Sequence, residues 1–374
     1  MGIFCKKDKF IITTGGTGGH IFPAMRIANY LIENRKHVTF ITDSRFKKFE
    51  NHFVDEAFFK GDNFKIHYLP ISNYRSSILR FLWTFFVSLV SCVAIIVKSR
   101  SSKIIGFGGY VSFIPLFISL FLCRTIYLHE QNSVVGRVNA IFSLFARRIF
   151  TTFPNTKGLT LSASKKALCT GLPIYVKSKY RAETYRVIEN ISQKQKINII
   201  ITGGSQGAQL FSKIIPGAIY DLVSSHMGRK FHVWYQAKDA EDAANATILF
   251  EKIPNLTFNI QCFFENIPEI LNFADIAIIR GGAASIYEVA MFRVFPIVIP
   301  ISNSIKNHQV LNASFLMEAN AGYLVGESDI TSHKLSSIIR GIISDPISFY
   351  RVTENLKKIF KSNPSQDIYS EITK

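Results

Sequence analysis

Apolar residues along this chain gather in short runs, each bounded by glycine or polar residues and separated from the next by a segment of helix length. The runs that we expect to form strands cover residues 10–14, 37–42, 103–107, 125–129, 148–152, 197–202, 231–235, 256–260, 276–279 and 295–299. Continuous apolar runs are typical of parallel strands that helices cover on both faces. We therefore predict an α/β protein built from two doubly wound, Rossmann-like sheets.

Two of the predicted strands run into glycine loops of the same design. The sequence GGTGGH occupies residues 15–20 after the first strand, and GGSQGA occupies residues 203–208 after the strand at 197–202. Glycine lets the backbone approach a ligand closely, and the free N–H groups of the following helix point at any anion bound there. We expect the first such helix over about residues 22–34. Two phosphate-binding halves indicate two phosphorylated substrates.

Further loops follow other predicted strands. They cover residues 106–110 and 129–132 in the first half, and residues 263–265 and 280–285 in the second. Open α/β sheets bind ligands at the carboxyl ends of their strands, so we expect these loops to line a cleft that both domains face. Neither glycine loop matches GxGxxG or the P-loop pattern, and each is a weak signal by itself.

The most apolar segment covers residues 81–97, 17 residues without a charge, and basic residues flank it on both sides. A transmembrane helix, a helix lying in the membrane interface and a core helix all fit this pattern. The length is at the lower end of the spanning range of about 17–25 residues. The flanking charges, together with Phe81 and Trp83, favour a lipid-facing stripe because anionic headgroups attract Lys and Arg. We predict a peripheral membrane protein.

The charge of the chain is unevenly distributed. The formal net charge is +18, and residues 1–173 hold 23 Lys and Arg against 8 Asp and Glu, a net of +15. Residues 174–374 hold 21 against 18, a net of +3. A basic surface attracts nucleic acid, anionic lipid or a polyphosphate ligand. The neighbouring apolar segment favours an anionic membrane surface, and we expect no nucleic-acid partner.

Length and cysteine usage limit the remaining classes. A chain of 374 residues accommodates two domains of ordinary size, and its hydrophobic content of 48% is that of a globular protein. The five cysteines show no CxxC spacing, which argues against a zinc site or a disulfide framework. No apolar leader precedes the first strand, so we expect a protein that is not exported.

Seven motifs in a fixed order resemble the MurG family, the N-acetylglucosaminyltransferases that convert lipid I to lipid II in bacterial peptidoglycan synthesis. They are GGTGGHIFPA, GFGGYVSFIP, HEQNSVVGRVN, TGLPI, ITGGSQGAQ, RGGAASIYEVA and NHQVLNA, between about residues 10 and 325. The resemblance implies a GT-B fold, UDP-N-acetylglucosamine (UDP-GlcNAc) as donor and lipid I as acceptor. It also implies an inverting, metal-independent reaction without a cofactor, at the cytoplasmic face of the bacterial inner membrane. Other cell-wall synthesis proteins are further candidate partners.

The resemblance also divides the chain and assigns its site. Residues 1–173 form the acceptor and membrane-associating domain, joined by a C-terminal helix over 351–374, and residues 174–350 form the donor domain. The acceptor-binding residues are Gly16, Thr17, Gly18, Gly19, Gly108, Tyr110 and Asn132. The donor-binding residues are Thr17, Gly18, Gly19, Asn132, Ser205, Gln206, Phe264, Ala283, Ala284, Ser285, Glu288, Gln309 and Asn312.

Several of these side chains have a specific expected role and a simpler alternative. Glu288 is expected to hold the ribose hydroxyls, since a carboxylate accepts two hydrogen bonds, or to be an exposed helix carboxylate. Phe264 is expected to lie against the uracil. Gln309 and Asn312 reach the sugar or order their own loop.

Two residues are candidates for the catalytic base. His20 closes the first glycine loop, and an imidazole exchanges protons near cellular pH. Its alternative role is to hold the acceptor pyrophosphate. Glu130 is the single acidic residue between Asp62 and Glu183, and it either acts as the base or neutralises a neighbour such as Arg137.

The chain departs from the family pattern in TGLPIY, where many members have Asn in place of Leu172 and Arg in place of Tyr175. That Arg meets the donor diphosphate in the family, and Lys177 or Arg280 could substitute. Two rival functions remain: another GT-B enzyme, either a lipid glycosyltransferase or a UDP-GlcNAc 2-epimerase, and a non-enzymatic basic membrane-binding adaptor.

Overall fold

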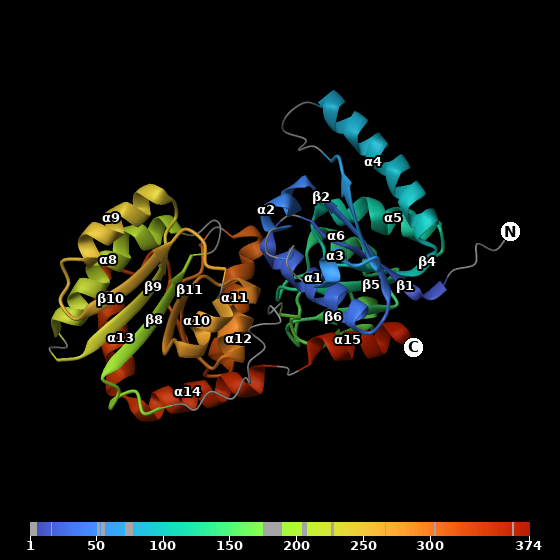
Figure 1. Cartoon of the computed structure of the whole chain (residues 1–374). Coiled ribbons are helices and arrows are strands. Elements are labelled where there is room, and N and C mark those ends of the chain that lie inside the picture. Colours follow the sequence, from blue (N-terminus) through green and yellow to red (C-terminus); the bar gives the residue numbers. More distant parts are fainter. Residues whose placement is uncertain are drawn as a thin grey trace. The chain divides into compact units, whose positions relative to one another are not determined.

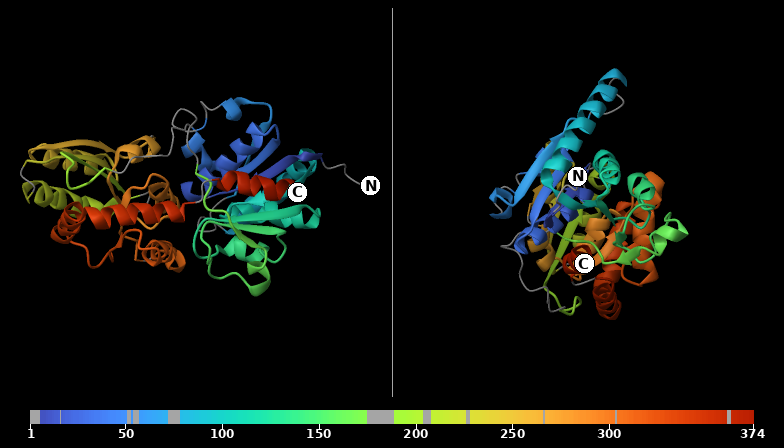
Figure 2. Two further views of the ribbon diagram at one scale, coloured as in Figure 1. Left: turned by 90° about the horizontal axis from the view of Figure 1, so that it is seen from below. Right: turned by 90° about the vertical axis from the view of Figure 1, so that its right-hand side faces the viewer.

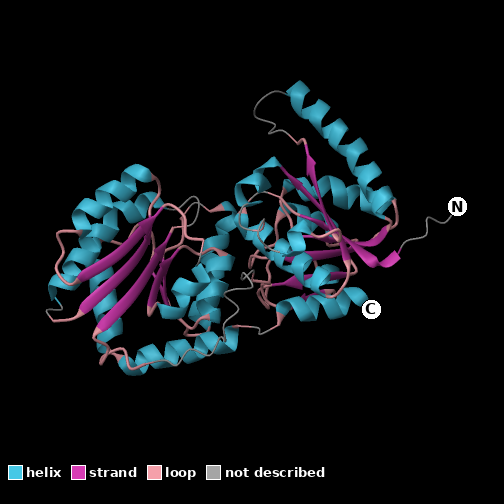
Figure 3. Ribbon diagram, viewed as in Figure 1, coloured by secondary structure: helices cyan, strands magenta, loops and turns pink. Residues whose placement is uncertain are grey.

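The chain folds into two compact units. The first consists of Met1–Ser178 with Lys361–Lys374, and the second of Lys179–Phe360. The computed structural model describes residues 6–15, 17–50, 53, 57–71, 78–174, 189–203, 208–225, 228–265, 267–302, 304–360 and 363–374. In both units a parallel sheet lies between layers of helices (Figures 1 and 3).

The first unit contains a parallel sheet of seven strands in the order β3-β2-β1-β4-β5-β6-β7. The strands are β1 (Lys6–Thr13), β2 (His37–Asp43), β3 (Phe64–Leu69), β4 (Ser101–Gly106), β5 (Thr125–Glu130), β6 (Arg148–Thr151) and β7 (Ala167–Cys169). Its helices are α1 (Gly18–Glu33), η1 (Ser44–Phe46), α2 (Lys47–Glu50), α3 (Ala57–Lys60), α4 (Ile78–Ser99), η2 (Tyr110–Ser112), α5 (Phe113–Phe121), α6 (Arg137–Phe142), α7 (Leu161–Ser164) and α15 (Pro364–Thr373). The strand order reverses between β1 and β4, and ligands of such sheets bind at this position.

Alternate residues of β1 explain why its apolar run is continuous. Phe10 and Ile12 pack on one face of the sheet with residues of α1, whereas Ile11 packs on the other face with residues of α4 and α5. Both faces are therefore buried, as parallel strands require. Helix α15, at the C-terminal end of the ribbon in Figure 2, covers part of the α1 side. On this side Tyr369 contacts Tyr30.

Helix α4 contains the apolar segment and packs along one narrow stripe. Its buried residues, Ser88, Cys92 and Ile96, follow one another at intervals of four. The opposite face carries exposed apolar side chains at helical spacing: Leu79, Trp83, Phe86, Val90 and Val97. Within the described residues, α4 alone is long and apolar enough to cross a membrane, by length and composition.

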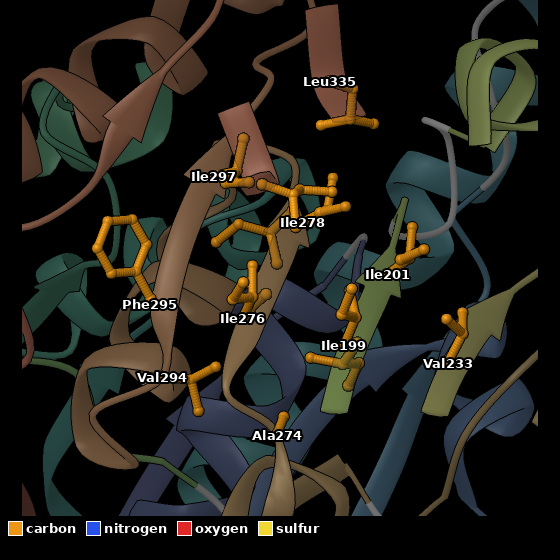
Figure 4. Close-up of a cluster of buried hydrophobic side chains, with 14 of the residues drawn as sticks. Ile199, Ile201, Val233, Ala274, Ile276, Ile278, Val294, Phe295, Ile297 and Leu335 are labelled. Atoms are coloured by element: carbon orange, nitrogen blue, oxygen red, sulfur yellow. The ribbon is translucent and has the colours of Figure 1, made fainter. Parts of the chain in front are cut away.

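The second unit contains a parallel sheet of six strands in the order β10-β9-β8-β11-β12-β13. The strands are β8 (Lys196–Thr202), β9 (Lys230–Gln236), β10 (Leu256–Gln261), β11 (Ile276–Ile279), β12 (Phe295–Val298) and β13 (Tyr323–Leu324). Its helices are α8 (Ala208–Ser225), α9 (Ala240–Phe250), α10 (Ile267–Phe273), α11 (Ala283–Met291), η4 (Ile305–Asn307), α12 (His308–Glu318), α13 (Ser332–Ser344) and α14 (Pro346–Ile359). Figure 4 shows part of its core, where Ile199, Ile278 and Ile297 of three neighbouring strands are drawn with Leu335 of α13.

Two boundaries differ from the sequence-based expectation. Helix α1 begins at Gly18 and not near Phe22, so His20 lies in its first turn. The expected C-terminal helix over 351–374 is two helices, of which α14 lies in the second unit and α15 in the first. Most of the polar segment between the two units, residues 175–188, lies outside the described residues.

Candidate functional site

In the first unit, the loops that follow β1 and β4 contact one another through glycine. Gly109 has a φ of +79°, and a Cβ atom there would lie 2.4 Å from the carbonyl oxygen of Gly15. A Cβ atom on Gly15 would in turn lie 2.7 Å from the Cβ of Val111. Contacts this short exclude any side chain, which explains why both loops contain glycine. Their approach brings Gly15 and residues 106–110 together where the strand order reverses.

The loop after β5 reaches the same place through a hydrogen-bonded chain. His20 Nδ1 lies 2.7 Å from Gln131 Oε1, and Gln131 Nε2 lies 3.1 Å from His129 Nδ1. The same Nε2 donates to the main-chain oxygen of His129 at 3.1 Å. His129 Nε2 lies 3.3 Å from the carbonyl oxygen of Gly171, which joins the TGLPI motif to the chain.

His129 is enclosed by this unit. Its ring stacks on Phe107, with centroids 5.2 Å apart, and no part of the residue is accessible to solvent. Burial lowers the pKa of His129 to about 4 because desolvation disfavours the charged imidazolium. The His129 ring is therefore neutral at pH 7. His20, at the other end of this series of hydrogen bonds, is partly exposed to solvent.

Glu130 is buried and holds its own loop. Its Oε1 accepts the main-chain N–H of Asn132 at 3.1 Å. Its Oε2 accepts the N–H of Gly136 at 2.9 Å and Nδ2 of Asn139 at 2.8 Å. With 1% of its surface exposed, this carboxylate orders the turn that leads into α6. Its partners are N–H groups and not Arg137, and this geometry favours His20 as the base.

The other acceptor-side residues surround the same loops. Thr17 is the exposed N-cap of α1, and Gly18 and Gly19 form the start of its first turn. A Cβ atom on Gly108 would lie 3.6 Å from Cε1 of His20. Asn132 is partly exposed in the turn that Glu130 holds. Gly16 lies outside the described residues.

Tyr110 has a cationic neighbour that the sequence did not reveal. The Arg45 guanidinium carbon lies 4.7 Å from the centroid of the Tyr110 ring, and Arg45 Nε donates to Asp43 Oδ2 at 2.8 Å. Burial raises the pKa of Tyr110, because desolvation disfavours the phenolate. Tyr110 is therefore a neutral hydroxyl group beside the Arg45–Asp43 ion pair, and this hydroxyl can donate a hydrogen bond to an anionic ligand.

In the second unit, the loop after β11 leads into α11. The first main-chain N–H groups of this helix, on Ala283, Ala284 and Ser285, have no partner within its own turns, as at every helix start. The N-cap, Gly282, supplies no side-chain acceptor for them. These N–H groups and the positive end of the helix dipole form a place where a diphosphate can bind.

Residues of α12 hold this loop and the segment that follows β12. A Cβ atom on Gly281 would lie 2.2 Å from the carbonyl oxygen of Gln309, so the two backbones touch. Asn312 is fully buried, and its Nδ2 donates to the Gly281 oxygen at 3.0 Å. Gln309 Oε1 accepts the N–H of Ile301 at 2.9 Å. In the described structure both residues order their loop, the alternative left open by the sequence.

Glu288 lies on α11 and has no hydrogen-bond partner among the described residues. It is partly exposed, and the surrounding protein still raises its pKa to about 7 because desolvation disfavours the carboxylate. Phe264 is 4% exposed and packs into the core, whereas the adjacent Phe263 is 45% exposed. Of these two rings, Phe263 has the surface on which a uracil ring could lie. It is the neighbour of Phe264, the residue predicted for this contact.

The Arg280 side chain already has partners within the second unit. Its Nη1 donates to the Ile299 oxygen at 2.9 Å, its Nη2 pairs with Glu327 at 3.1 Å, and its guanidinium lies over the ring of Phe211. A buried Arg with these partners supports the loop and is poorly placed to replace the family Arg. Ser205, Gln206, Tyr175 and Lys177 lie outside the described residues.

Comparisons with known proteins agree with the order of the motifs. Models of the glycosyltransferase family 28 N-terminal and C-terminal domains match residues 10–151 and 198–371. The UDP-N-acetylglucosamine–N-acetylmuramyl-(pentapeptide) pyrophosphoryl-undecaprenol N-acetylglucosamine transferase of Rickettsia bellii is 32% identical and covers 94% of this chain and 95% of its own. The protein of the same name from Rickettsia felis is also 32% identical, with the same coverage. This chain belongs to the MurG family. The resemblance seen in the sequence motifs is thereby confirmed.

Solved structures agree at the level of the fold. MurG of Acinetobacter baumannii is 22% identical, with a TM-score of 0.74 over 97% of this chain and 99% of its own. The UDP-GlcNAc 2-epimerase of Neisseria meningitidis bound to UDP-GlcNAc is 13% identical, with a TM-score of 0.64 and the same coverage. The predicted GT-B fold with two Rossmann-like domains is confirmed. This fold is shared with epimerases and does not identify the reaction.

Proposed function

We propose that this protein transfers N-acetylglucosamine from UDP-GlcNAc to the muramoyl sugar of undecaprenyl-pyrophosphoryl-MurNAc-pentapeptide, converting lipid I to lipid II. The observation that carries the proposal is that relatives named for this transfer match 94% of the chain, so that both units fall within the match. Epimerases share the fold at much lower identity, 13% for the Neisseria meningitidis enzyme.

The second unit binds the donor in this proposal. The free N–H groups of Ala283, Ala284 and Ser285 hold the diphosphate and stabilise the negative charge that develops as UDP leaves. Ser205 and Gln206 belong to the same diphosphate site. Glu288, ionised, accepts hydrogen bonds from the ribose hydroxyls. Phe264, with Phe263 beside it, lies near the uracil, and Gln309 and Asn312 keep the loop in place.

The first unit binds the acceptor and supplies the base. Gly18 and Gly19 offer the N–H groups of the α1 start to the acceptor pyrophosphate, with Thr17 as their N-cap. His20 removes the proton from the muramoyl hydroxyl as that oxygen forms its bond to the anomeric carbon. The bond from this carbon to the diphosphate oxygen breaks at the same time, and UDP leaves with the electron pair. A single displacement of this kind inverts the anomeric configuration.

The exposed face of α4 brings the enzyme to its lipid substrate. Leu79 is 75% exposed and Trp83 67% exposed, on the face of α4 opposite its buried stripe. A helix with one packed face and one apolar exposed face suits the membrane interface, and the basic first half attracts anionic headgroups. We place the protein at the cytoplasmic face of the bacterial inner membrane, bound peripherally. Other cell-wall synthesis proteins remain candidate partners.

The transfer is tested with labelled UDP-GlcNAc and a soluble lipid I analogue. The expected result is a labelled disaccharide product that forms only when the analogue is present. Release or epimerisation of the sugar without the analogue would contradict the transferase proposal and favour the epimerase. Transfer to diacylglycerol and not to the analogue would favour a lipid glycosyltransferase.

The membrane proposal is tested separately by sedimentation with anionic phospholipid vesicles. The double variant Leu79→Glu/Trp83→Glu should lose most vesicle binding and keep its transfer to the soluble analogue. The matched control is Ile347→Glu, an exposed apolar residue on α14 of the second unit, which should bind vesicles as the wild type does. Unchanged vesicle binding by the double variant would show that α4 does not face the lipid.

A further inference from the structure

The hydrogen-bonded chain from His20 to Gly171 determines which ring nitrogen of His20 carries a proton. The starting point is the bond from the Gln131 side-chain amide to the His129 main-chain oxygen, at 3.1 Å. A carbonyl oxygen can only accept, so the atom facing it must be the amide nitrogen. This contact fixes the orientation of the amide, which otherwise has to be inferred from its surroundings.

The orientation of the amide decides the state of His20. The Gln131 oxygen is left facing His20 Nδ1 at 2.7 Å. Because an amide oxygen also only accepts, Nδ1 must be the protonated nitrogen. In the neutral ring, Nε2 then has a free lone pair.

The hydrogen bonds of His129, at the other end of the series, agree with this assignment. The second amide proton of Gln131 is donated to His129 Nδ1 at 3.1 Å, so this nitrogen accepts. His129 Nε2 then carries the proton and donates to the Gly171 oxygen at 3.3 Å. Each donor in the chain has an acceptor, and the neutral state that burial enforces on His129 is the one required.

We propose that Gln131 is a positioning residue that holds His20 in the Nδ1–H tautomer, which leaves Nε2 free to accept the proton of the acceptor hydroxyl. This inference rests on the proposed function through the role of His20 as base. The hydrogen bond at one ring nitrogen orients a histidine and sets its tautomer. For metal-bound histidines, loss of such a backing group typically reduces metal affinity or activity by about 10- to 100-fold, and we expect a loss of the same order here.

The tautomer is measured by long-range ¹H–¹⁵N NMR on protein labelled at histidine nitrogens, with the His20 signals assigned from His20→Gln. The wild type should show a protonated Nδ1 and an unprotonated Nε2 at His20. Gln131→Met, of similar size and without the amide, should shift His20 towards the Nε2–H form. A wild-type His20 protonated at Nε2, or an unchanged tautomer in Gln131→Met, would overturn the proposal.

The kinetic test uses three variants. Gln131→Met should lower kcat about 10- to 100-fold, with little change in KM for UDP-GlcNAc. Gln131→Glu restores an acceptor oxygen to Nδ1 and should recover part of that kcat, although it cannot donate to His129. His129→Phe keeps a ring against Phe107 and leaves the main-chain bond to Gln131, and should lower kcat less than Gln131→Met. Equal losses in Gln131→Met and Gln131→Glu would indicate a purely structural role.

The two proposals fail in different ways. If the wild type transfers no sugar to the lipid I analogue, the proposed function is wrong, whatever tautomer His20 adopts. If the wild type transfers sugar and Gln131→Met does so at the same rate, the positioning role of Gln131 is wrong and the proposed function stands.

Discussion

In the first unit the candidate proton acceptor belongs to a set of hydrogen-bonded side chains, whereas in the second the candidate diphosphate site is made of backbone. His20, Gln131 and His129 form a chain of side-chain hydrogen bonds between two loops. At the start of α11 the groups available to a ligand are main-chain N–H groups, and the side chain of Asn312 holds the backbone that presents them. The difference follows from the chemistry proposed for each unit, because accepting a proton needs a titratable group and holding a diphosphate needs several fixed donors.

The two halves also differ in charge and in surface. Residues 1–173 have a net charge of +15 and residues 174–374 a net of +3. The first unit also carries the exposed apolar face of α4. A soluble donor needs no membrane surface, while an acceptor with a lipid chain does, so these surface features fit the unit that supplies the base in the proposed function. Four variants test the different roles proposed for the two units.

The largest effect is expected from His20→Ala. Removing a general base typically costs about 10²- to 10⁴-fold in kcat, and KM for UDP-GlcNAc should change little because the proposed donor site lies in the other unit. Steady-state kinetics with the soluble acceptor analogue measures both constants. The matched control is His37→Ala, an exposed histidine at the start of β2, which should keep wild-type kcat. An unchanged kcat in His20→Ala would remove the proton-transfer role from His20 and leave Glu130 as the remaining candidate base.

In the second unit the largest effect is expected from backbone crowding. Gly281→Ala places a Cβ atom 2.2 Å from the Gln309 oxygen, and overpacking of this kind typically costs about 1–3 kcal/mol. Urea unfolding should show this loss, and binding of UDP-GlcNAc should weaken as the loop moves. Gly282→Ala is the control, because a Cβ atom there would lie 4.0 Å from its nearest neighbour, Oγ of Ser285, and the φ of Gly282 is −68°. Equal stability of the two variants would contradict the close loop packing.

The variant Glu130→Gln tests whether Glu130 orders its loop or transfers a proton. The amide keeps one acceptor oxygen but turns an NH₂ group towards N–H donors that the carboxylate now satisfies. Leaving buried donors without an acceptor typically costs about 1–3 kcal/mol, which thermal or urea unfolding can measure. The loss in kcat should be much smaller than that of His20→Ala. A larger kcat loss than His20→Ala, with normal stability, would make Glu130 the base.

The sequence predicted the fold well where the strands are central and buried. It missed β3, whose residues 64–69 alternate between apolar and polar, and the short strands β7 and β13. All three are edge strands of their sheets. Edge strands carry a weaker signal because one face or one side is open to solvent. The glycine loops were recognisable because glycine is required wherever two backbones touch.

The sequence could not predict the partners of the site residues. His20 and Gln131 are 111 positions apart, and only the fold brings them within 2.7 Å. The motif HEQN contains both His129 and Gln131, so the residues were visible while their contact was not. Glu130 attracted attention as a lone carboxylate in a basic stretch, but its N–H partners depend on the shape of the turn into α6. The residue types indicated which side chains can accept a proton. The contacts in the folded structure show which of them is already held by other groups.

The smallest expected effect concerns the pH dependence of donor binding at Glu288. Its pKa is raised to about 7, so the carboxyl is protonated below pH 7 and ionised above it. If the ionised form accepts the ribose hydroxyls, affinity for UDP-GlcNAc should rise with pH and level off above about 8. At pH 6 about one molecule in ten is ionised, so Kd by calorimetry should be about tenfold weaker than on the plateau. The diphosphate of UDP-GlcNAc is a diester and does not titrate in this range.

Two variants make this last measurement decisive. Glu288→Gln cannot ionise, so it should bind UDP-GlcNAc weakly and with no dependence on pH between 6 and 8. Glu318→Gln, an exposed carboxylate on α12, should keep the wild-type curve. Affinity that falls as pH rises would mean that Glu288 acts as a hydrogen-bond donor in its protonated form. In both cases donor binding depends on one titratable side chain as well as on main-chain N–H groups, and only a wild-type affinity that does not change with pH would leave a donor site made of backbone alone.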